Sequence, residues 1–511
     1  MDGPIPEIDR GTGRPIGVQL VEGLRRRILD GVLRPGDAVP STRALAAELA
    51  VSRSAVVAAY EQLAGEGYLD MRQGAPTRVA ALILAGTAGG AGAADAPDAL
   101  GDGARASSGR ERRVPAAMTR SSRPFDGMAA PDGAAGSAMP AGAPAPPRID
   151  LLPGRPSTAR IDTRAWRAAW RHAAALDIPS ESPPPFGVAR LRAEIADHLR
   201  LARGVACAPD DVVVTAGTAE ALALVASALG LLVGGAPHVA VEHPGYPSAR
   251  RTIERRGALT IPVPVDGDGI DVDVLRRMPR PPHAVMVTPS HQYPLGGRLP
   301  VAARLELLEW ARAARAVVIE DDYDSEFRHL GPPLPALASL DSERVALVGS
   351  FSKVLTPWLR LGYLVLPADP ALREAITAIR ADEPSPVPGT AQEAAAALLA
   401  SGAVRRHIAV TRREYAHRRR LVLAALDGLP GAPLSGLDGG LHAVLGLPDA
   451  ATAAAVADRL AAEGVAVASL AEYAAVPGDG RAGLVFGYAG PTDTLLAEGL
   501  ERIRAAVAAA T

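Results

Sequence analysis

Short apolar runs alternate with longer helical patterns from residue 149 onward. Near-continuous apolar runs fill residues 212–215, 239–241, 284–287, 316–319 and 345–348. Strands of a parallel sheet covered on both faces are apolar at nearly every position, so these runs predict such strands. Helical periodicity over residues 219–229 and 301–315 predicts crossover helices. The pattern therefore predicts a doubly wound α/β domain.

A helical periodicity precedes this block in residues 1–80. Leu20, Leu24 and Ile28 form one apolar stripe, which predicts a helix over residues 19–30. Further helical patterns, residues 42–50 and 53–65, each follow a serine, Ser41 and Ser52, and serine is a preferred N-cap residue. Residues 68–79 resemble two short strands joined by a glycine turn. Two capped helices followed by a β-hairpin predict a winged helix-turn-helix, which presents the start of its second capped helix to a DNA major groove.

The stretch between these blocks, residues 81–148, shows neither pattern. It is rich in Ala, Gly, Pro and Ser and carries charges of both signs. Such a composition buries too little apolar surface to offset the loss of chain entropy, so it predicts a flexible, partly polyproline-like linker. We therefore divide the chain into a winged helix-turn-helix domain (residues 1–80), a linker (81–148) and an α/β domain (149–511).

The composition limits which binding partners and which cellular compartment are expected for the protein. The formal net charge is −2, and residues 1–80 hold ten arginines and ten acidic residues, so DNA affinity would depend on where the charges are placed. The single cysteine, Cys207, excludes an intramolecular disulfide and fits a reducing compartment. The chain shows no signal-peptide pattern, and its apolar runs are too short to span a bilayer. We expect a soluble cytoplasmic protein without membrane contact.

Lysine is nearly absent, because Lys353 is the only lysine among 54 lysine and arginine residues. A guanidinium stays protonated, whereas a buried ε-amine can lose its proton and condense with an aldehyde. An Ala/Arg-rich composition could leave one lysine by chance, so the surroundings decide. Ser350 and Ser352 flank Lys353 and Arg360 follows, which together could bind an anion.

Other chemically suitable groups stand at the carboxyl ends of predicted strands, where open α/β sheets bind their ligands. In chain order they are Gly217, Thr218, Ala219, Tyr246, Asp321 and Tyr323. The first three join a strand to a helix, and their backbone N–H groups form an anion cradle. Alone, a tyrosine in a Gly/Pro turn usually serves packing, and an aspartate after a strand is more often a helix cap. Their joint occurrence in this order indicates a ligand site.

One cofactor fits these groups together. Pyridoxal 5′-phosphate (PLP) requires an amine for its aldehyde, an anion site for its phosphate and a carboxylate opposite its pyridinium nitrogen. Lys353 supplies the Schiff-base amine, and Asp321 pairs with the ring nitrogen. Tyr246 could stack on the ring, and Tyr323 could bond the phenolate oxygen. The phosphate would meet Ser350, Ser352, Arg360 and the loop of Gly217, Thr218 and Ala219. No metal site is predicted.

The N-terminal block closely resembles the winged-helix domain of GntR-family transcription factors. The resemblance rests on the runs LRPGD (residues 33–37), PSTRALA (40–46) and LAGEGYL (63–69). In that family the arginine of the PSxR turn, the start of the recognition helix and the wing tip contact DNA. The resemblance implies a double-stranded operator as partner, with contacts from Arg43, Ser52, Arg53, Ser54, Gln73 and Gly74. The alternative is a small helical docking module, which the neutral charge of the block would suit.

The C-terminal block, residues 149–508, resembles fold-type-I, aspartate-aminotransferase-like domains. The motif order GTAEAL, EHPGYP, TPSHQYPLG, EDDYDSEF and GSFSK is similar to the MocR subfamily of GntR regulators. There a winged helix is joined through a long linker to an aminotransferase-like domain. The resemblance implies a mostly parallel sheet with helices on both faces, a small C-terminal α/β subdomain, and the PLP-binding roles given above. It also places His291 and Gln292 in the segment that lines the cofactor and effector pocket, and implies a homodimer.

Two segments depart from that family pattern. Residues 183–187, PPPFG, stand where related domains carry a Y-G-D-P-x-G entry loop. The predicted C-terminal strand, residues 484–489, has no internal arginine, although an arginine near it often binds the substrate carboxylate in this fold. Arg481 is the nearest candidate. The sequence therefore leaves open whether any transamination occurs.

Two functions fit the sequence. The first is PLP-dependent transcriptional regulation, in which the effector is either an amine or amino acid that displaces Lys353, or PLP itself. The second is a PLP-dependent aminotransferase that carries a vestigial N-terminal domain. The C-terminal motifs suit both functions, and the intact winged-helix pattern favours regulation.

Overall fold

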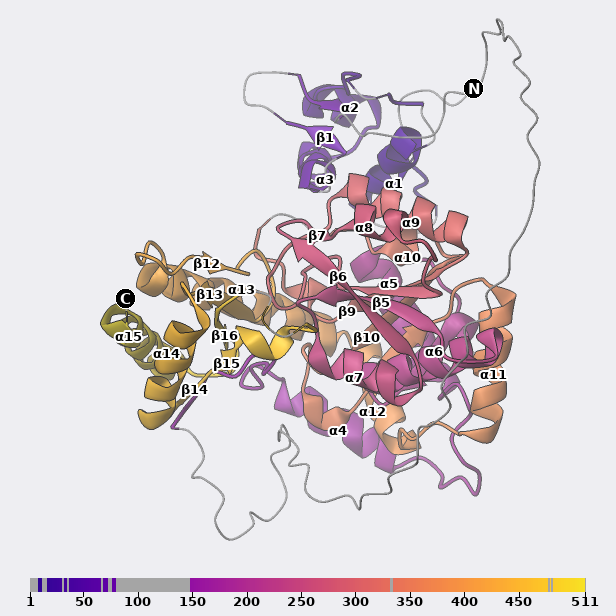
Figure 1. Cartoon of the computed structure of the whole chain (residues 1–511). Helices are drawn as coiled ribbons and strands as arrows, with labels where there is room; N and C mark the ends of the chain where they lie inside the picture. The colour runs from indigo at the N-terminus through magenta and orange to yellow at the C-terminus, as the bar shows by residue number, and fades with distance from the viewer. Residues whose placement is uncertain are drawn as a thin grey trace, which may run out of the picture. The chain divides into compact units, whose positions relative to one another are not determined.

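The computed structural model describes residues 8–11, 16–29, 32–34, 36–65, 68–71, 76–79, 148–330, 334–476, 478 and 481–510. The linker predicted over residues 81–148 lies outside the described residues except for its last residue, and so do the wing residues Gln73 and Gly74. The described helices include none that is long and apolar enough to cross a membrane. Figure 1 labels the elements in chain order.

The N-terminal region folds as a winged helix-turn-helix. Its elements are α1 (Ile16–Leu29), α2 (Thr42–Glu48), α3 (Arg53–Gly65), β1 (Leu69–Asp70) and β2 (Arg78–Val79). The predicted stripe of Leu20, Leu24 and Ile28 is buried in its core. Both predicted caps form, because the hydroxyls of Ser41 and Ser52 accept hydrogen bonds from backbone N–H groups three residues later, over 3.2 Å. β1 and β2 pair antiparallel, as a wing requires.

The large sheet has eight strands in the order β4-β11-β10-β9-β8-β5-β6-β7. They are β4 (Val212–Thr215), β5 (His238–His243), β6 (Leu259–Asp266), β7 (Gly269–Ile270), β8 (Ala284–Val287), β9 (Val317–Asp322), β10 (Val345–Ser350) and β11 (Gly362–Val365). All five strands predicted from apolar runs belong to this sheet. The neighbouring strands β10, β9, β8, β5 and β6 pair parallel, in that order across the sheet. Strand β11 lies antiparallel between β10 and β4.

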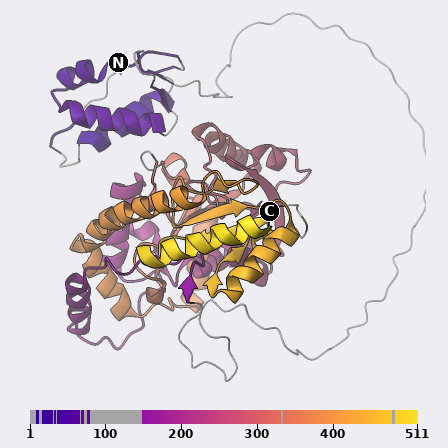
Figure 2. The same ribbon diagram turned by 90° about the vertical axis from the view of Figure 1, so that its left-hand side faces the viewer.

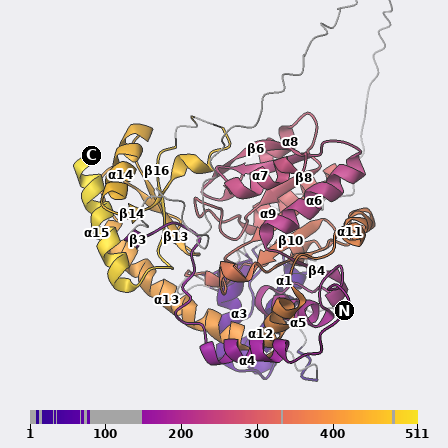
Figure 3. The ribbon, with the colours of Figure 1, turned by 90° about the horizontal axis from the view of Figure 1, so that it is seen from below.

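Helices cover both faces of this sheet (Figures 1 and 3). Val213 packs into a core with α6 (Thr218–Val233), α7 (Pro247–Arg255) and α11 (Pro370–Asp382). Its neighbours Val212 and Val214 pack into the opposite core, which includes residues of α5 (Ala189–Arg203), α9 (Val301–Ala314), α12 (Gly389–Ala400) and α13 (Ala403–Leu426). Successive strand residues point to opposite faces, so a strand between two cores must be apolar throughout.

A smaller C-terminal subdomain adjoins the large sheet. Its antiparallel sheet has the order β12-β13-β16-β15, formed by β12 (Leu434–Ser435), β13 (His442–Gly446), β15 (Ala468–Ser469) and β16 (Gly483–Gly487). The long helix α13 runs beside α15 (Asp493–Ala510), which also packs on α14 (Ala450–Ala462) (Figure 2). β3 (Ile149–Asp150) pairs parallel with β14 (Val465–Ala466), so the first residues of the α/β domain belong to this subdomain.

Candidate functional site

The structure brings most of the predicted cofactor residues to the carboxyl edge of the large sheet. Asp321, near the end of β9, lies opposite Val348 of β10 in the parallel register. Lys353 follows three residues after β10, and the loop at Gly217 follows β4 directly. This edge is where open α/β sheets bind their ligands.

Lys353 is held by a backbone carbonyl. Its Nζ atom donates a hydrogen bond over 2.6 Å to the carbonyl oxygen of Gly154. Burial lowers the pKa of the Lys353 amine, while Asp324 and Asp321 oppose that shift. Gly154 has φ +84°, which favours glycine, and a Cβ there would lie 2.7 Å from Nζ, so the lysine side chain would have to move. The amine is thus aimed and has an increased neutral fraction.

Asp321 has a carboxylate oxygen that lacks a partner. The side chain is buried, and its Oδ1 atom forms no hydrogen bond with any described group. Burial, together with the charges of Asp322 and Glu242, raises the pKa of Asp321 to about 8. Glu242 is itself buried, which raises its pKa to about 7 although Thr288 donates two hydrogen bonds to it. A cationic N–H donor would satisfy Asp321, and the pyridinium nitrogen of PLP is such a donor.

The residues that were predicted to bind the PLP phosphate lie on both sides of the antiparallel strand β11. Gly362 pairs with Ser350 on one side and with Thr215 on the other. A Cβ at Gly362 would lie 2.8 Å from the Cα of Gly217. Glycine at both positions therefore allows the loop after β4 and the loop after β10 to approach each other. Arg360 donates from Nη2 to the carbonyl of Ala216 over 3.0 Å. Thr218 and Ala219 form the first turn of α6, whose uncapped N–H groups favour an anion.

Aromatic rings form one wall of the site. Tyr293 makes edge contacts with Tyr246, Tyr323 and Tyr473, at centroid distances of 5.6, 5.4 and 5.4 Å. Tyr246 keeps 40% of its surface exposed, so a ring can still stack on it. Tyr293 was not predicted from the sequence, although it follows directly after the predicted His291 and Gln292. Tyr473 was not predicted either, because it stands far along the chain and belongs to no motif.

His291 and Gln292 occupy different positions relative to the site. The Nδ1 atom of His291 lies 2.9 Å from both the Tyr323 hydroxyl and Asp324 Oδ2. Burial alone would lower the pKa of His291, but the charge and hydrogen bond of Asp324 raise it. Gln292 donates its amide to the carbonyls of Pro244 and Tyr293, so its side chain fixes the loop. A direct cofactor contact of Gln292 stays a prediction.

His442 extends this polar wall. The ligand atoms of His291, Asp324 and His442 lie within 4.8 Å of one another, a group that could hold a metal ion, although the sequence predicted no metal site. Hydrogen bonds occupy both nitrogens of His291 and the Nε2 atom of His442, which contacts Pro294 O at 2.8 Å. Burial lowers the pKa of His442 to about 4. We interpret His291, Asp324 and His442 as a hydrogen-bonded wall of the site, in which neutral groups lie beside charged ones.

The two segments that depart from the family pattern have protein partners. Arg481 donates from Nη2 to the carbonyl of Val265 over 2.8 Å, which ties it to β6. The backbone of residues 183–187 extends the edge at β4, because Val214 N–H donates to the carbonyl of Phe186 over 2.9 Å. A Cβ at Gly187 would lie 2.5 Å from the Val214 side chain. Arg481 is thus held by β6, and residues 183–187 contact the edge of β4.

The described DNA-contact candidates lie at helix starts and are exposed. Arg43 stands in the first turn of α2, and Arg53 begins α3. The hydroxyls of Ser52 and Ser54 lie 3.1 Å apart. Arg78 on the wing donates to the carbonyl of Gly36 over 2.7 Å, so it stabilises the base of the wing. These exposed side chains suit the backbone and base contacts of a recognition helix.

Comparison with known proteins covers both blocks of the chain. Residues 149–503 match the aminotransferase class I and II family, and residues 17–79 match the gntR family of bacterial regulatory proteins. The HTH-type pyridoxine biosynthesis transcriptional regulator PdxR of Corynebacterium glutamicum is 41% identical, over 93% of this chain and 92% of its own length. The probable rhizopine catabolism regulatory protein MocR of Rhizobium meliloti is 36% identical, over 82% of this chain and 78% of its own.

Solved structures match the C-terminal block. LysN, the α-aminoadipate aminotransferase of Thermus thermophilus in complex with N-(5′-phosphopyridoxyl)-L-leucine, matches with a TM-score of 0.63 at 27% identity. The match covers 71% of this chain and 92% of LysN. The aminotransferase class I and II family is PLP-dependent, so PLP is the cofactor of this fold. The residues at the carboxyl edge fit PLP, since they offer an amine, an unpaired carboxylate oxygen and an anion cradle.

Proposed function

This chain belongs to the MocR-type GntR regulators, in which a GntR winged helix precedes an aminotransferase class I and II domain, and we propose that it adjusts transcription to the occupancy of its Lys353 site by PLP. Relatives that align along both blocks are named transcriptional regulators, among them PdxR and the HTH-type regulator TauR of Rhodobacter capsulatus. This favours a PLP-dependent regulator over an aminotransferase with a vestigial N-terminal domain.

The unpaired Oδ1 atom of Asp321 carries the proposal, because the protein alone leaves this buried carboxylate oxygen without a donor. An amino-acid effector would also need a cation for its carboxylate, and the candidate Arg481 already donates to Val265. The name of PdxR, a pyridoxine biosynthesis regulator 41% identical to this chain, points in the same direction. We therefore favour PLP itself over an amine as the effector.

The roles of the site residues follow from their contacts. When bound, PLP supplies an aldehyde that reacts with an amine and a ring that withdraws electrons. Lys353 offers an amine with a lowered pKa, aimed by the Gly154 carbonyl. Asp321 would accept the hydrogen bond of the ring nitrogen, and Arg360 with the start of α6 would bind the phosphate. His291 would hold the Tyr323 hydroxyl in place.

We further infer a homodimer. Trp358 lies in the turn η3 (Pro357–Leu359), between Lys353 and Arg360, and 79% of its surface is exposed. A single exposed apolar side chain is common on protein surfaces, so the inference rests on the homodimer that the MocR resemblance implies, and Trp358 is a residue to test at the interface. PLP must bind one arrangement of the dimer better than another, typically by about 1–3 kcal/mol. The linker, residues 81–148, which neither family match covers, would transmit that difference.

The test is operator affinity with and without PLP. The full chain and Lys353→Ala are titrated onto DNA from the region upstream of its own gene, after PLP loading has been checked by absorption. We expect PLP to change the affinity of the wild type by roughly 5–150-fold and to leave Lys353→Ala unchanged. An unchanged affinity of the loaded wild type would refute PLP as effector. A further change caused only by an added amine would assign that role to the amine.

A further inference from the structure

An acidic side chain stands at the anion cradle, where its charge would repel a phosphate. Glu220 is the acidic residue in the first turn of α6. No side chain caps the start of this helix, so its backbone N–H groups are left for an anion. A carboxylate this close to a phosphate site lowers the affinity for the anion unless another charge compensates it.

Glu220 also shapes the loop that joins β4 to α6. Its Oε2 atom accepts a hydrogen bond from the backbone N–H of Ala216. The carbonyl of Ala216 accepts a hydrogen bond from Arg360 Nη2 over 3.0 Å. The residue before Gly217 is therefore fixed at both its N–H and its carbonyl group. Glu220 thus supports the shape of the cradle, although its charge opposes the ligand.

Arg380 provides the compensating charge. It lies in the last turn of α11 and is 1% exposed, and its Nη2 atom lies 2.6 Å from Glu220 Oε1. The same nitrogen donates to the carbonyl of Val214 over 3.2 Å, which holds the guanidinium against β4. A buried guanidinium needs a counter-ion, and the interaction of two charges is stronger away from water. Each of the two side chains therefore neutralises the other behind the loop.

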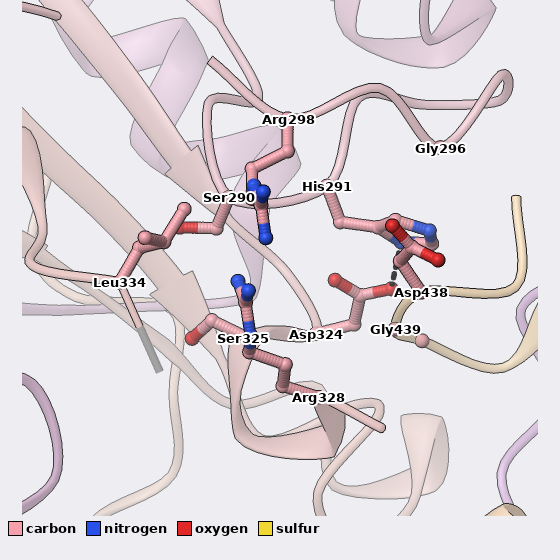
Figure 4. A pocket seen from close by; sticks show the side chains of 11 residues that line it. Ser290, His291, Gly296, Arg298, Asp324, Ser325, Arg328, Leu334, Asp438 and Gly439 are labelled. Carbon is pink, nitrogen blue, oxygen red and sulfur yellow. Dashed lines mark hydrogen bonds and ion pairs between the residues drawn. The ribbon is translucent and has the colours of Figure 1, made fainter. Parts of the chain in front are cut away.

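A cavity beside the polar wall also contains two arginines, Arg298 and Arg328 (Figure 4). They share this small space with two acids, Asp324 and Asp438. An anion there would meet both carboxylates at close range. At the cradle, by contrast, the acid in the first turn of α6, Glu220, already has a cationic partner. The start of α6 is therefore the better place for the phosphate, as long as that ion pair is intact.

We propose that Arg380 is a positioning residue for the PLP phosphate, because it orients Glu220 in the loop and cancels the carboxylate charge that would repel the ligand. This inference rests on the proposed position of the phosphate at the start of α6. The two members of the pair have different tasks. Glu220 supplies the hydrogen bond that closes the loop, and Arg380 supplies the charge that lets an anion approach.

A second ion pair of the same helix offers a matched control. Arg373, near the start of α11, has its Nη2 atom 2.6 Å from Asp211 Oδ1. Asp211 directly precedes β4 and Ala216 directly follows it, so the control pair lies at the opposite end of the strand from the cradle. Loss of either ion pair should destabilise the fold, whereas only the loss of Arg380 should affect the phosphate.

The experiment compares the affinities of the full chain for PLP and for pyridoxal, which lacks the phosphate, by fluorescence titration. Arg380→Met should weaken PLP binding roughly ten- to a hundredfold and leave pyridoxal binding nearly constant, because an uncompensated Glu220 repels the phosphate alone. Glu220→Gln removes the charge but keeps an acceptor for the Ala216 N–H, so it should bind PLP at least as tightly as the wild type. The double variant should recover most of the wild-type affinity, and Arg373→Met should bind both ligands as the wild type does.

The opposite effects of the two single variants distinguish charge compensation from a merely structural role. A pair that only supports the fold would weaken the binding of both ligands in both variants. An unchanged PLP affinity of Arg380→Met, equal losses for PLP and pyridoxal, or a loss of PLP affinity in Glu220→Gln would overturn the proposal. Melting curves identify a variant that does not fold, and if Arg380→Met is such a variant, Glu220→Gln decides. The operator titration uses none of these variants, so the proposed response of DNA binding to PLP stands or fails separately.

Discussion

Lys353 Nζ donates a 2.6 Å hydrogen bond to the carbonyl of Gly154, 199 residues earlier in the chain. Gly154 follows β3, which pairs with β14 in the C-terminal subdomain, whereas Lys353 follows β10 of the large sheet. The bond therefore connects two parts of the α/β domain at the amine. A ligand that occupies Lys353 would release Gly154, which offers a direct route from cofactor occupancy to subdomain arrangement.

Gly154→Ala should raise PLP affinity. The added Cβ would lie 2.7 Å from Lys353 Nζ, so the amine must move from its place. Gly204→Ala is the matched control, because Gly204 also has a positive φ, +66°, but its Cβ would meet nothing within 4 Å. Each variant should lose about 1 kcal/mol of unfolding free energy. The added Cβ crowds the amine only while Lys353 is free, because PLP releases Gly154, so Gly154→Ala should gain PLP affinity in an absorption titration and Gly204→Ala should leave it unchanged. A loss of affinity in Gly154→Ala would contradict the steric explanation.

Asp321 should make the PLP-free protein sensitive to pH. Its pKa is raised to about 8 in the folded state, so the folded chain holds one more proton than the unfolded chain between about pH 4 and 8. Stability therefore falls as pH rises through this window. From pH 6 to 9 the PLP-free wild type should lose about 2 kcal/mol relative to Asp321→Asn, measured by denaturant unfolding.

The exposed Asp382→Asn variant controls for this effect, and it should follow the wild type at every pH. A parallel pH dependence of wild type and Asp321→Asn would contradict the raised pKa. The same substitution should weaken PLP binding by roughly ten- to a hundredfold, because it removes the charge that a pyridinium N–H would meet. If Asp321 is a carboxylate that binds the cofactor, Asp321→Asn should be more stable than the wild type at high pH and should bind PLP more weakly.

Arg360 should matter for the phosphate of the ligand and not for its ring. Arg360→Ala should lower PLP affinity by roughly ten- to a hundredfold, whereas the affinity for pyridoxal, which lacks the phosphate, should stay nearly constant. Fluorescence titration with both ligands gives the ratio directly, and Arg280→Ala serves as the control. An equal loss for the two ligands would place Arg360 away from the phosphate.

The apolar runs predicted the five main strands because burial between two helical layers demands apolar residues on both strand faces. Strand β11, residues 362–365, was not predicted, and its run begins with glycine, which interrupts the apolar pattern. That glycine is what lets the loops at Ser350 and Gly217 approach each other. The main α/β layers were thus predictable from local pattern, whereas the closeness of the two loops depends on a pairing between distant segments.

The residues of the site, too, were predictable only as far as local sequence allows. Lys353 was predictable because it is the only lysine of the sequence, and Asp321 because it occurs in order with the other groups of the site. Gly154 and Asp324 were not selected, although one aims the amine and the other holds His291. Their sequence neighbourhoods, Leu-Pro-Gly-Arg and Tyr-Asp-Ser-Glu, are compatible with ordinary turns. Their roles arise from tertiary contacts across 199 and 33 residues, which no local pattern encodes.

Arg53 should contribute to DNA binding without affecting the cofactor. It begins α3 and is exposed, so it can reach phosphates or base edges. Arg53→Ala should weaken operator binding and, if it meets a phosphate, reduce the salt dependence by about one unit in the log–log slope. The absorption of bound PLP should stay unchanged. Arg26→Ala, an exposed arginine on α1, is the control, and equal losses for both would exclude a recognition role for Arg53.

Deletion of residues 85–145 should separate the two activities. The deletion lies between the matches to the gntR and aminotransferase families, so both folded parts keep their cores. We expect PLP binding and DNA binding to persist in the deleted chain, measured by absorption and by operator titration. The change in operator affinity caused by PLP should fall toward onefold, because coupling requires that one part bias the arrangement of the other.

Replacement by a Gly/Ser segment of equal length tests composition against length, since a flexible chain of the same reach should restore part of the response. A deleted chain that unfolds would show that these residues belong to a core, and one that keeps its full PLP response would show that coupling takes another route.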